Sequence, residues 1–365
     1  MSSWEYTETE VFRHGTGEYS IFHVFGLISV KNNVFVWAEA RKGSGKDAGE
    51  IHDIAMCTSR DSGRTFGPMQ VMELGEASCY TNPTPVYDSA TDRLFLFYAK
   101  NDENLRTINE IIFSDDLGKT WSEPQNINSV LEAENPELCY HLPGPGHGIC
   151  LKHGGHKGRL LVQFWHLKKD SDRKASEGGD TSSLLYSDDH GVTWHQTGFI
   201  GRDFYANESR LVETRYDLVR VMRPGVQANL RYNRYISRST DDGMTWSDPE
   251  VMPVSPSSWC DDGAVSVAGK SGYEDMVLMS RPSCTDKRHD MEILLSTDGG
   301  RTFPGHCALP RGDAMPGYSD LCVIQEKEPV IGLLHCRCNH VLFSRISLQT
   351  VTGGQYEGTS RDVWL

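Results

Sequence analysis

The chain has 365 residues, with 35 glycines, 10% aromatic residues and a formal net charge of −14 at pH 7. This charge argues against a nucleic-acid partner and against anionic membrane surfaces, because both repel an acidic protein. No stretch approaches the roughly 18 to 20 continuous apolar residues that a membrane-spanning helix requires, so we expect no membrane span.

The N-terminal residues 1–15 lack the basic start and the apolar run of a secretory signal peptide. This favours a cytoplasmic location, while a leader that was removed stays open. The ten cysteines include no CxxC pair, so we interpret them as mainly free, buried thiols of an intracellular protein. The single Asn-x-Ser/Thr sequon, at Asn207, lies in a segment that we assign to the pocket below, so we expect no glycan there.

Five copies of the pattern Ser-x-Asp-x-Gly-x-Thr-Trp/Phe divide the chain at intervals of 55, 73, 52 and 57 residues. Each copy follows an apolar, strand-like run, such as residues 111–113 or 293–295. The aspartate can bond backbone amides two or three residues on, and glycine tolerates positive φ, so each copy predicts a tight hairpin turn. The aromatic residue then packs between neighbouring sheets, so we assign the pattern to the scaffold. The copies span 59–66, 114–121, 187–194, 239–246 and 296–303.

Five copies at this spacing resemble the Asp-boxes of the sialidase family. The resemblance implies an all-β, six-bladed propeller in which one blade lacks the box and the closing blade combines the two chain termini. Repeats at such periods are typical of propellers and solenoids. The chain has no Pro- or Ser-rich linker and little helical periodicity, so we expect residues 1–365 to form one domain.

Two further segments resemble the catalytic motifs of sialidases. Residues 317–321, Gly-Tyr-Ser-Asp-Leu, resemble the motif of the nucleophilic tyrosine, which implies Tyr318. Residues 207–213 resemble the segment of its partner glutamate, which implies Glu208. A phenol with an ordinary pKa near 10 is a poor nucleophile at neutral pH, and a neighbouring carboxylate can take its proton during attack. A tyrosine nucleophile is the known exception to the two-carboxylate rule for glycosidases.

Residues 38–47 read as a strand end with Glu39-x-Arg41 that continues into a glycine-rich loop. In sialidases this loop carries the general acid, and the resemblance implies Asp47 for that role, with Glu39 and Arg41 beside the substrate. Such a loop lets a carboxyl group lie over the substrate, where shielding from water raises its pKa. A solvated loop aspartate is the alternative, and Asp53 is a fallback acid.

Sialidases hold the sugar carboxylate with three arginines, because guanidinium groups match a carboxylate in a forked geometry. Arg223, and Arg288 eight residues before the fifth repeat, resemble two of them. The third belongs to a Tyr-Arg-Ile-Pro motif, which a gapless count places on residues 21–24. Phe22 then stands where the arginine is expected. His23 could supply a partial positive charge, although strand alternation points it away from Phe22.

Asn82-Pro83 and residues 144–149 resemble turns that line the sugar pocket of sialidases, which implies Asn82 and His147 as substrate contacts. Both segments also suit ordinary turns, since glycine and proline dominate them. Within residues 336–340, two cysteines and a histidine alternate on one face of a strand, but zinc would need a fourth ligand and a more usual spacing. We therefore expect neither a metal nor a cofactor.

These residues favour a retaining exo-glycosidase that removes a terminal α-linked sialic acid, or a related nonulosonic or ulosonic acid, from a glycoconjugate. Phe22 in place of an arginine leaves open a hydrolase or lyase for a different acidic sugar on the same scaffold. A non-catalytic carbohydrate-binding propeller is the third hypothesis, against which the joint presence of Tyr318, Glu208 and Asp47 counts. Fold analogy alone does not separate the three.

Overall fold

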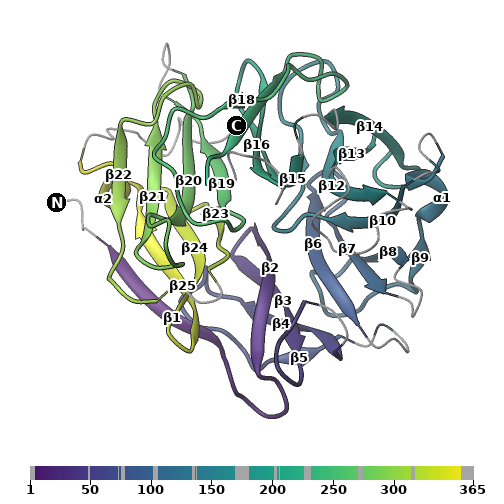
Figure 1. The fold of residues 1–365 in the computed structure, drawn as a ribbon, viewed down its shortest axis with the longest axis horizontal. Helices are drawn as coiled ribbons and strands as arrows, with labels where there is room; N and C mark the ends of the chain where they lie inside the picture. The colour runs from purple at the N-terminus through teal and green to yellow at the C-terminus, as the bar shows by residue number, and fades with distance from the viewer. Residues whose placement is uncertain are drawn as a thin grey trace.

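The protein is all-β in this computed structural model, with six antiparallel sheets arranged as blades around a central axis (Figure 1). The all-β, six-bladed propeller expected from the repeats is confirmed. The structure describes residues 5–47, 50–72, 74, 79–101, 106–133, 136, 138–168, 181–200, 204, 206–225, 232–269, 274–313 and 317–354.

Each blade runs from an inner strand at the axis to an outer strand at the rim, and five of the six follow chain order. The first two blades are β2 (Ile21–Val30), β3 (Asn33–Arg41), β4 (His52–Ser59), β5 (Gln70–Val71), and β6 (Tyr80–Asp88), β7 (Arg93–Asn101), β8 (Thr107–Ser114), β9 (Gln125–Asn126). The third is β10 (Leu138–Pro143), β12 (Leu160–Lys168), β13 (Thr181–Ser187), β14 (His195–Ile200), with β11 (Ile149–Cys150) paired to β12. The fourth and fifth are β15 (Ala206–Glu213), β16 (Leu218–Pro224), β17 (Tyr235–Ser239), β18 (Glu250–Val251), and β19 (Gly263–Val267), β20 (Met276–Pro282), β21 (Met291–Ser296), β22 (Gly305–Ala308).

The sixth blade joins the two ends of the chain. It comprises β23 (Asp320–Ile324), β24 (Val330–Arg337), β25 (His340–Ser347) and, at the rim, β1 (Tyr6–Arg13). β1 pairs antiparallel with β25, as the adjacent purple and yellow strands in Figure 1 show. The closing blade therefore combines both termini, as predicted. In the described part of the chain, the helices α1 (Asn128–Leu131) and α2 (Leu348–Val351) are single turns, and neither could cross a membrane.

The five repeats form the turns between the third and fourth strands of five blades. In the first, Asp61 accepts hydrogen bonds from Ser59 Oγ at 2.7 Å, and from the amide and hydroxyl of Thr65 at 2.9 and 2.7 Å. Gly63, with φ of 80°, packs the turn tightly against Phe343 of the closing blade. The repeats thus link each turn to the preceding blade, which agrees with their assignment to the scaffold.

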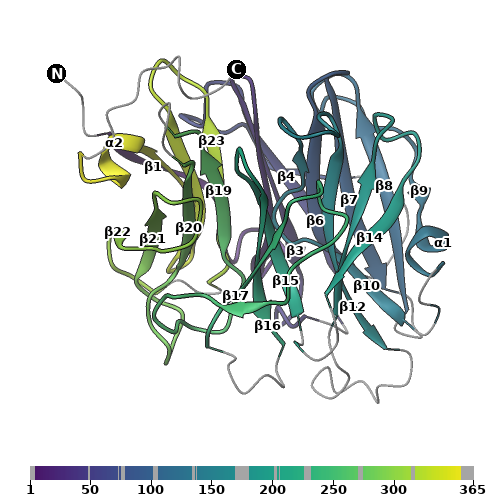
Figure 2. The same cartoon turned by 90° about the horizontal axis from the view of Figure 1, so that it is seen from above.

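Figure 2 shows the same molecule from above, with the inner strands β6, β15, β19 and β23 labelled. The last residues of β2, β6, β15, β19 and β23 line a common cavity at one end, so the first residues of these strands meet at the opposite end. β-bulges interrupt the pairing near the start of four of the inner strands, and bulges turn side chains out of simple alternation. The register shifts lie between His23 and Phe25, Thr81 and Thr84, Leu138 and Tyr140, and Ala206 and Ser209.

Candidate active site

Tyr318 and Glu208 come together where the inner strands begin. The Tyr318 hydroxyl donates to the Glu208 carboxylate, and its oxygen lies 2.7 and 2.9 Å from the two carboxylate oxygens. Arg223 Nη1 lies 2.5 Å from the Tyr318 hydroxyl and also pairs with Glu208. Tyr318 is 7% exposed and Glu208 5% exposed. A phenol, a carboxylate and a guanidinium therefore share one largely desolvated contact.

Local backbone geometry aims these side chains. Glu208 lies inside the bulge at the start of β15, where the register shifts between Ala206 and Ser209. Tyr318 follows Gly317, which has φ of 95°, and a Cβ at position 317 would overlap the Arg288 side chain. Only glycine meets both conditions without strain. Gly317 thus allows Arg288 to approach the backbone beside the tyrosine.

The Tyr318 hydroxyl is held in its neutral form. Burial raises its pKa well above the ordinary value of 10; the positive charge of Arg223 opposes that rise and the negative charge of Glu208 adds to it. The proton can leave only when an acceptor takes it, and Glu208 lies within hydrogen-bond distance to do so. The pair can therefore produce a transient nucleophile without a resident phenolate.

Arg223 and Arg288 both lie against Tyr318 and Trp259. The guanidinium carbon of Arg223 is 4.1 Å from the centroid of the Trp259 ring, and Arg288 Nη2 donates to the Trp259 carbonyl at 2.8 Å. The Arg288 guanidinium carbon lies 5.5 Å from the Tyr318 ring centroid. The buried Arg223 Nε has no hydrogen-bond partner among the described residues. The structure thus gathers two cationic groups suited to an anionic ligand.

His23 lies beside Tyr318, whereas the gapless count along the sequence had put Phe22 at the position of the missing arginine. The two rings meet edge-on, with centroids 4.5 Å apart and planes at 86°. A bulge follows His23, and Val24 within it has φ of 47°. His23 Nδ1 accepts the Val24 amide proton at 2.6 Å, so the ring carries its own proton on Nε2. Burial, and then the charges of Arg41 and Arg288, lower the pKa of His23 well below 6.5, which makes it a neutral donor.

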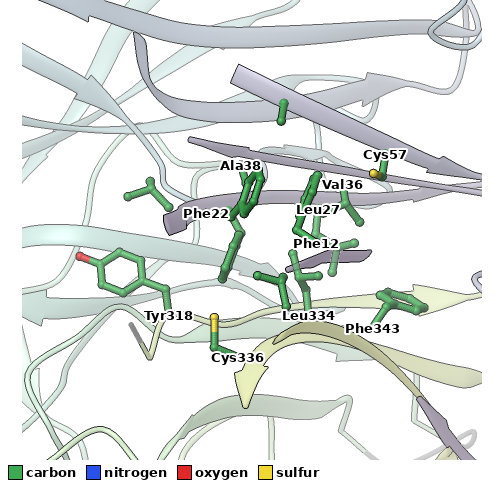
Figure 3. Packing of buried hydrophobic residues seen from close by; sticks show 14 of the residues in the cluster. Phe12, Phe22, Leu27, Val36, Ala38, Cys57, Tyr318, Leu334, Cys336 and Phe343 are labelled. Carbon is green, nitrogen blue, oxygen red and sulfur yellow. The ribbon is translucent and has the colours of Figure 1, made fainter. Parts of the chain in front are cut away.

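Phe22, which the gapless count put at the arginine position, lies in the hydrophobic core. Phe22 is fully buried, and its ring stacks on Phe12 with centroids 4.8 Å apart. Figure 3 shows both rings inside the core, with the Tyr318 hydroxyl pointing away from them. Phe22 and His23 face opposite sides of β2, as strand alternation predicts, so His23 is the one of the two that meets Tyr318.

Glu39 and Arg41 form a buried pair that reaches the loop of Asp47. Arg41 Nε and Nη2 donate to Glu39 at 2.8 and 2.5 Å, while Arg41 Nη1 lies 2.5 Å from Asp47 Oδ1. The Asp47 side chain is 89% exposed. Asp53 belongs to a separate group, since it accepts from the Tyr19 hydroxyl at 2.8 Å. Arg41 thus holds the Asp47 carboxylate, and the role of Asp47 as the acid stays a prediction.

Asn82 and His147 lie in different surroundings. Asn82 is buried next to Glu39, which accepts the Asn82 amide at 2.9 Å, and its side chain donates to the Pro143 carbonyl at 2.8 Å. His147 contacts Asp320 at 3.1 Å and lines the cavity at the opposite end of the axis. His147 thus lies between that cavity and Asp320, the first residue of β23, and its contact with the sugar stays a prediction.

A buried charge network below Tyr318 was not predicted from the sequence. Arg210 pairs with Asp261, and its Nε lies 3.6 Å from Asp320. Burial raises the pKa of Asp261 well above its ordinary value, although Arg210 opposes the shift. The signal available in the sequence was the position of these charges beside predicted site residues, two after Glu208 and two after Tyr318. The network joins the fourth, fifth and sixth blades under the candidate site.

The strand face expected through residues 336–340 does not form. Arg337 pairs with His340 across β24 and β25, so residues 338–339 make the turn between the two strands. His340 Nδ1 instead pairs with Glu10 of β1. The cysteines and the histidine of this segment therefore do not converge on one point.

Comparison with known proteins agrees with this architecture. Residues 52–336 match the family described as "BNR repeat-like domain". The chain is 27% identical over 374 residues to a sialidase of Bacteroides fragilis, a match that covers 93% of this chain and 64% of the relative. It is 25% identical over 311 residues to sialidase-3 of Mus musculus, covering 70% of this chain and 72% of the relative.

Solved structures give the same result. The Hadza microbial sialidase Hz136 superposes with a TM-score of 0.79 at 26% identity, covering 93% of this chain and 68% of that one. The intramolecular trans-sialidase from Ruminococcus gnavus in complex with oseltamivir carboxylate shares the fold, with a TM-score of 0.74 at 18% identity and coverage of 94% and 98%. The chain spans 64% of the Bacteroides fragilis relative and 54% of a Micromonospora viridifaciens sialidase. It belongs to the family of BNR repeat-like domains and to the sialidase superfamily.

Proposed function

We propose that the protein is a retaining exo-glycosidase that removes a terminal α-linked sialic acid, or a related nonulosonic or ulosonic acid, from glycoconjugates. The observation that carries the proposal is the Tyr318 hydroxyl within 2.7 Å of Glu208, buried beside two arginines. A tyrosine with a purely structural role would not require both a carboxylate and a guanidinium in contact with its hydroxyl oxygen. The printed names of the relatives, all sialidases, support the substrate class.

In the first step, the Tyr318 oxygen attacks the anomeric carbon while its proton passes to Glu208. The bond to the glycosidic oxygen breaks, and that oxygen takes a proton from the Asp47 carboxyl group as the aglycone leaves. In the second step, Asp47 takes a proton from water, which attacks the same carbon, and the Tyr318 oxygen leaves and recovers its proton from Glu208. Two inversions give retention of configuration.

The substrate carboxylate would lie between the guanidinium groups of Arg223 and Arg288. Arg223 Nε, which lacks a partner among the described groups, supplies one donor. His23 Nε2 would add a neutral hydrogen bond from the direction of β2. A neutral nucleophile matters here because a phenolate would repel the carboxylate beside the carbon that it attacks.

Tyr318→Phe tests the mechanism. The variant keeps the ring and loses the attacking oxygen, so turnover of an aryl α-sialoside should fall to a small fraction of the original rate. Tyr235→Phe, on β17 of the fourth blade, is the matched control and should keep the rate. Mass spectrometry after reaction with a fluorinated substrate analogue should place the sugar on the Tyr318 peptide. Unchanged turnover in Tyr318→Phe would overturn the mechanism.

The neutral His23 favours a second candidate, a hydrolase or lyase for a different acidic sugar. A clamp with two cations and one neutral donor holds a carboxylate less strongly than one with three cations. A panel of aryl glycosides of sialic, nonulosonic and hexuronic acids separates the two candidates by relative kcat/KM. An unsaturated product that absorbs in the near ultraviolet would indicate elimination rather than hydrolysis.

A further inference from the structure

The loop between β20 and β21 brings a cysteine, a histidine and an aspartate together. Pro282 and Met291 are the last paired residues of the two strands, and the Ser283 amide donates to the Asp290 carbonyl at 3.0 Å. Cys284 and His289 therefore lie in the loop, directly after Ser283 and directly before Asp290. The donor atoms of Cys284, His289 and Asp290 all lie within 4.8 Å of one another. The hairpin register thus produces the cluster.

The separations within the cluster lie within a few tenths of an ångström of those around a small tetrahedral ion. Asp290 Oδ2 lies 3.9 Å from Cys284 Sγ and 3.1 Å from His289 Nδ1. Zinc binds sulfur, nitrogen and oxygen ligands at about 2.0 to 2.3 Å, which sets neighbouring ligand atoms of a tetrahedron roughly 3.3 to 3.7 Å apart. A thiolate, an imidazole and a carboxylate form a donor set that prefers zinc over magnesium or calcium.

The second nitrogen of His289 supports the same assignment independently. His289 Nε2 lies 3.4 Å from Asp286 Oδ1, on the side of the ring away from Nδ1. Histidines that bind metals through one nitrogen commonly donate the other N–H to a carboxylate, which fixes the ring and raises its basicity. Asp286 is thus placed to orient His289 while Nδ1 faces the cluster.

We propose that Cys284, His289 and Asp290 form a zinc site with three protein ligands and a fourth position for water. Asp286 is the positioning residue that orients His289. The proposal departs from the sequence-based expectation of no metal, and it does not depend on the proposed glycosidase activity. Arg288 directly precedes His289 in the same loop, and its guanidinium carbon lies 5.5 Å from the Tyr318 ring centroid, so a metal at this loop would restrain that arginine.

Cobalt(II) tests the site without reference to activity, because it takes the same tetrahedral geometry and absorbs visible light. The full chain is stripped with a chelator under reducing conditions and titrated with Co²⁺. We expect visible bands of a tetrahedral ion together with a near-ultraviolet band from thiolate to cobalt, and Zn²⁺ should abolish both. Since a thiol must lose its proton to bind, affinity should fall as the pH is lowered.

Variants assign the bands to residues. Cys284→Ser should remove the thiolate band, whereas Cys307→Ser, a partly exposed cysteine on β22 of the same blade, should keep it. Asp286→Asn should weaken Co²⁺ binding roughly tenfold and leave the thiolate band in place. A spectrum of hydrated, octahedral cobalt in the unmodified chain would overturn the proposal, as would a thiolate band that survives in Cys284→Ser. If Cys284→Ser fails to fold, His289→Gln serves instead, and tight tetrahedral binding by that variant also refutes the site.

Discussion

At the scale of single residues, the proposed chemistry depends on whether Glu208 can accept a proton. Glu208→Gln keeps the size of the side chain and its hydrogen bond to Tyr318 but removes the basic oxygen. The rate on an aryl α-sialoside should fall by roughly 10² to 10⁴-fold, the usual contribution of a general base. Glu213→Gln, five residues along β15 at the opposite end of the axis, should keep the rate. Equal rates in the two variants would contradict the assignment.

Short sequence motifs pointed to four residues that the fold brings together, while their roles in catalysis stay a proposal. Tyr318, Glu208, Arg223 and Arg288 each lie in a short recognisable segment, and the structure brings all four together. The bulge after His23, where the pairing of β2 with β3 shifts register, was not predicted. Counting positions along a regular strand cannot anticipate such a bulge.

The Arg210 network shows a second limit of sequence reasoning. Arg210, Asp261 and Asp320 come from three blades, and only the closed ring places them in contact. Each charge alone looks like an ordinary polar residue near a turn. The three side chains interact strongly because they are buried together, and a local sequence pattern does not reveal burial.

At the scale of elements, the Asp-box turns were fully predictable, because every hydrogen bond that closes them lies within eight residues. Asp298 in the fifth blade accepts from Ser296 Oγ and from the amide and hydroxyl of Thr302. Bulges and loop courses were not predictable, since they depend on the adjacent sheet. The same distinction separates scaffold from site throughout the molecule.

Asp298→Ala should therefore lower stability without touching the chemistry. The change leaves the amides of Arg301 and Thr302 and the hydroxyls of Ser296 and Thr302 without their acceptor, which costs about 1 to 3 kcal/mol of unfolding free energy. Urea denaturation should show a lower midpoint with an unchanged slope, and kcat at 25 °C should stay within experimental error. Asp248→Ala, on an exposed stretch outside the repeat, is the control. A Asp298→Ala variant as stable as the unmodified chain would show that solvent replaces these bonds fully.

At the scale of the whole molecule, closure of the ring depends on pairing between the first and last segments of the chain. Arg337 on β24 pairs with Glu8 on β1. His335, on the same strand, is buried next to Glu8. The sixth blade is thus complete only when both termini are in place. We therefore expect the unfolding free energy of this blade to reflect closure of the whole ring.

Buried histidines make that stability depend on pH. Burial lowers the pKa of His141 and of His335 to about 4. In the unfolded chain each would bind a proton near pH 6.5, so each favours the folded state fully above that pH and progressively less as the pH falls toward 4. Between pH 8 and pH 5 the loss is about 2 kcal/mol for each histidine. The box carboxylate of Asp61, with its pKa lowered to about 2, titrates below this window.

Urea midpoints at pH 8, 6.5 and 5 test this dependence, because the two histidines predict a monotonic fall in unfolding free energy across the series. His335→Gln keeps a hydrogen-bonding group near Ser344, whose hydroxyl lies 2.9 Å from His335 Nε2, and removes one titrating site. Its free energy should change less between pH 8 and pH 5, by about 2 kcal/mol, than that of the unmodified chain. His153→Gln, at an exposed position, should keep the full dependence. If His335→Gln and His153→Gln show the same slope, protons do not enter the sixth blade on unfolding, and acid sensitivity must come from another blade.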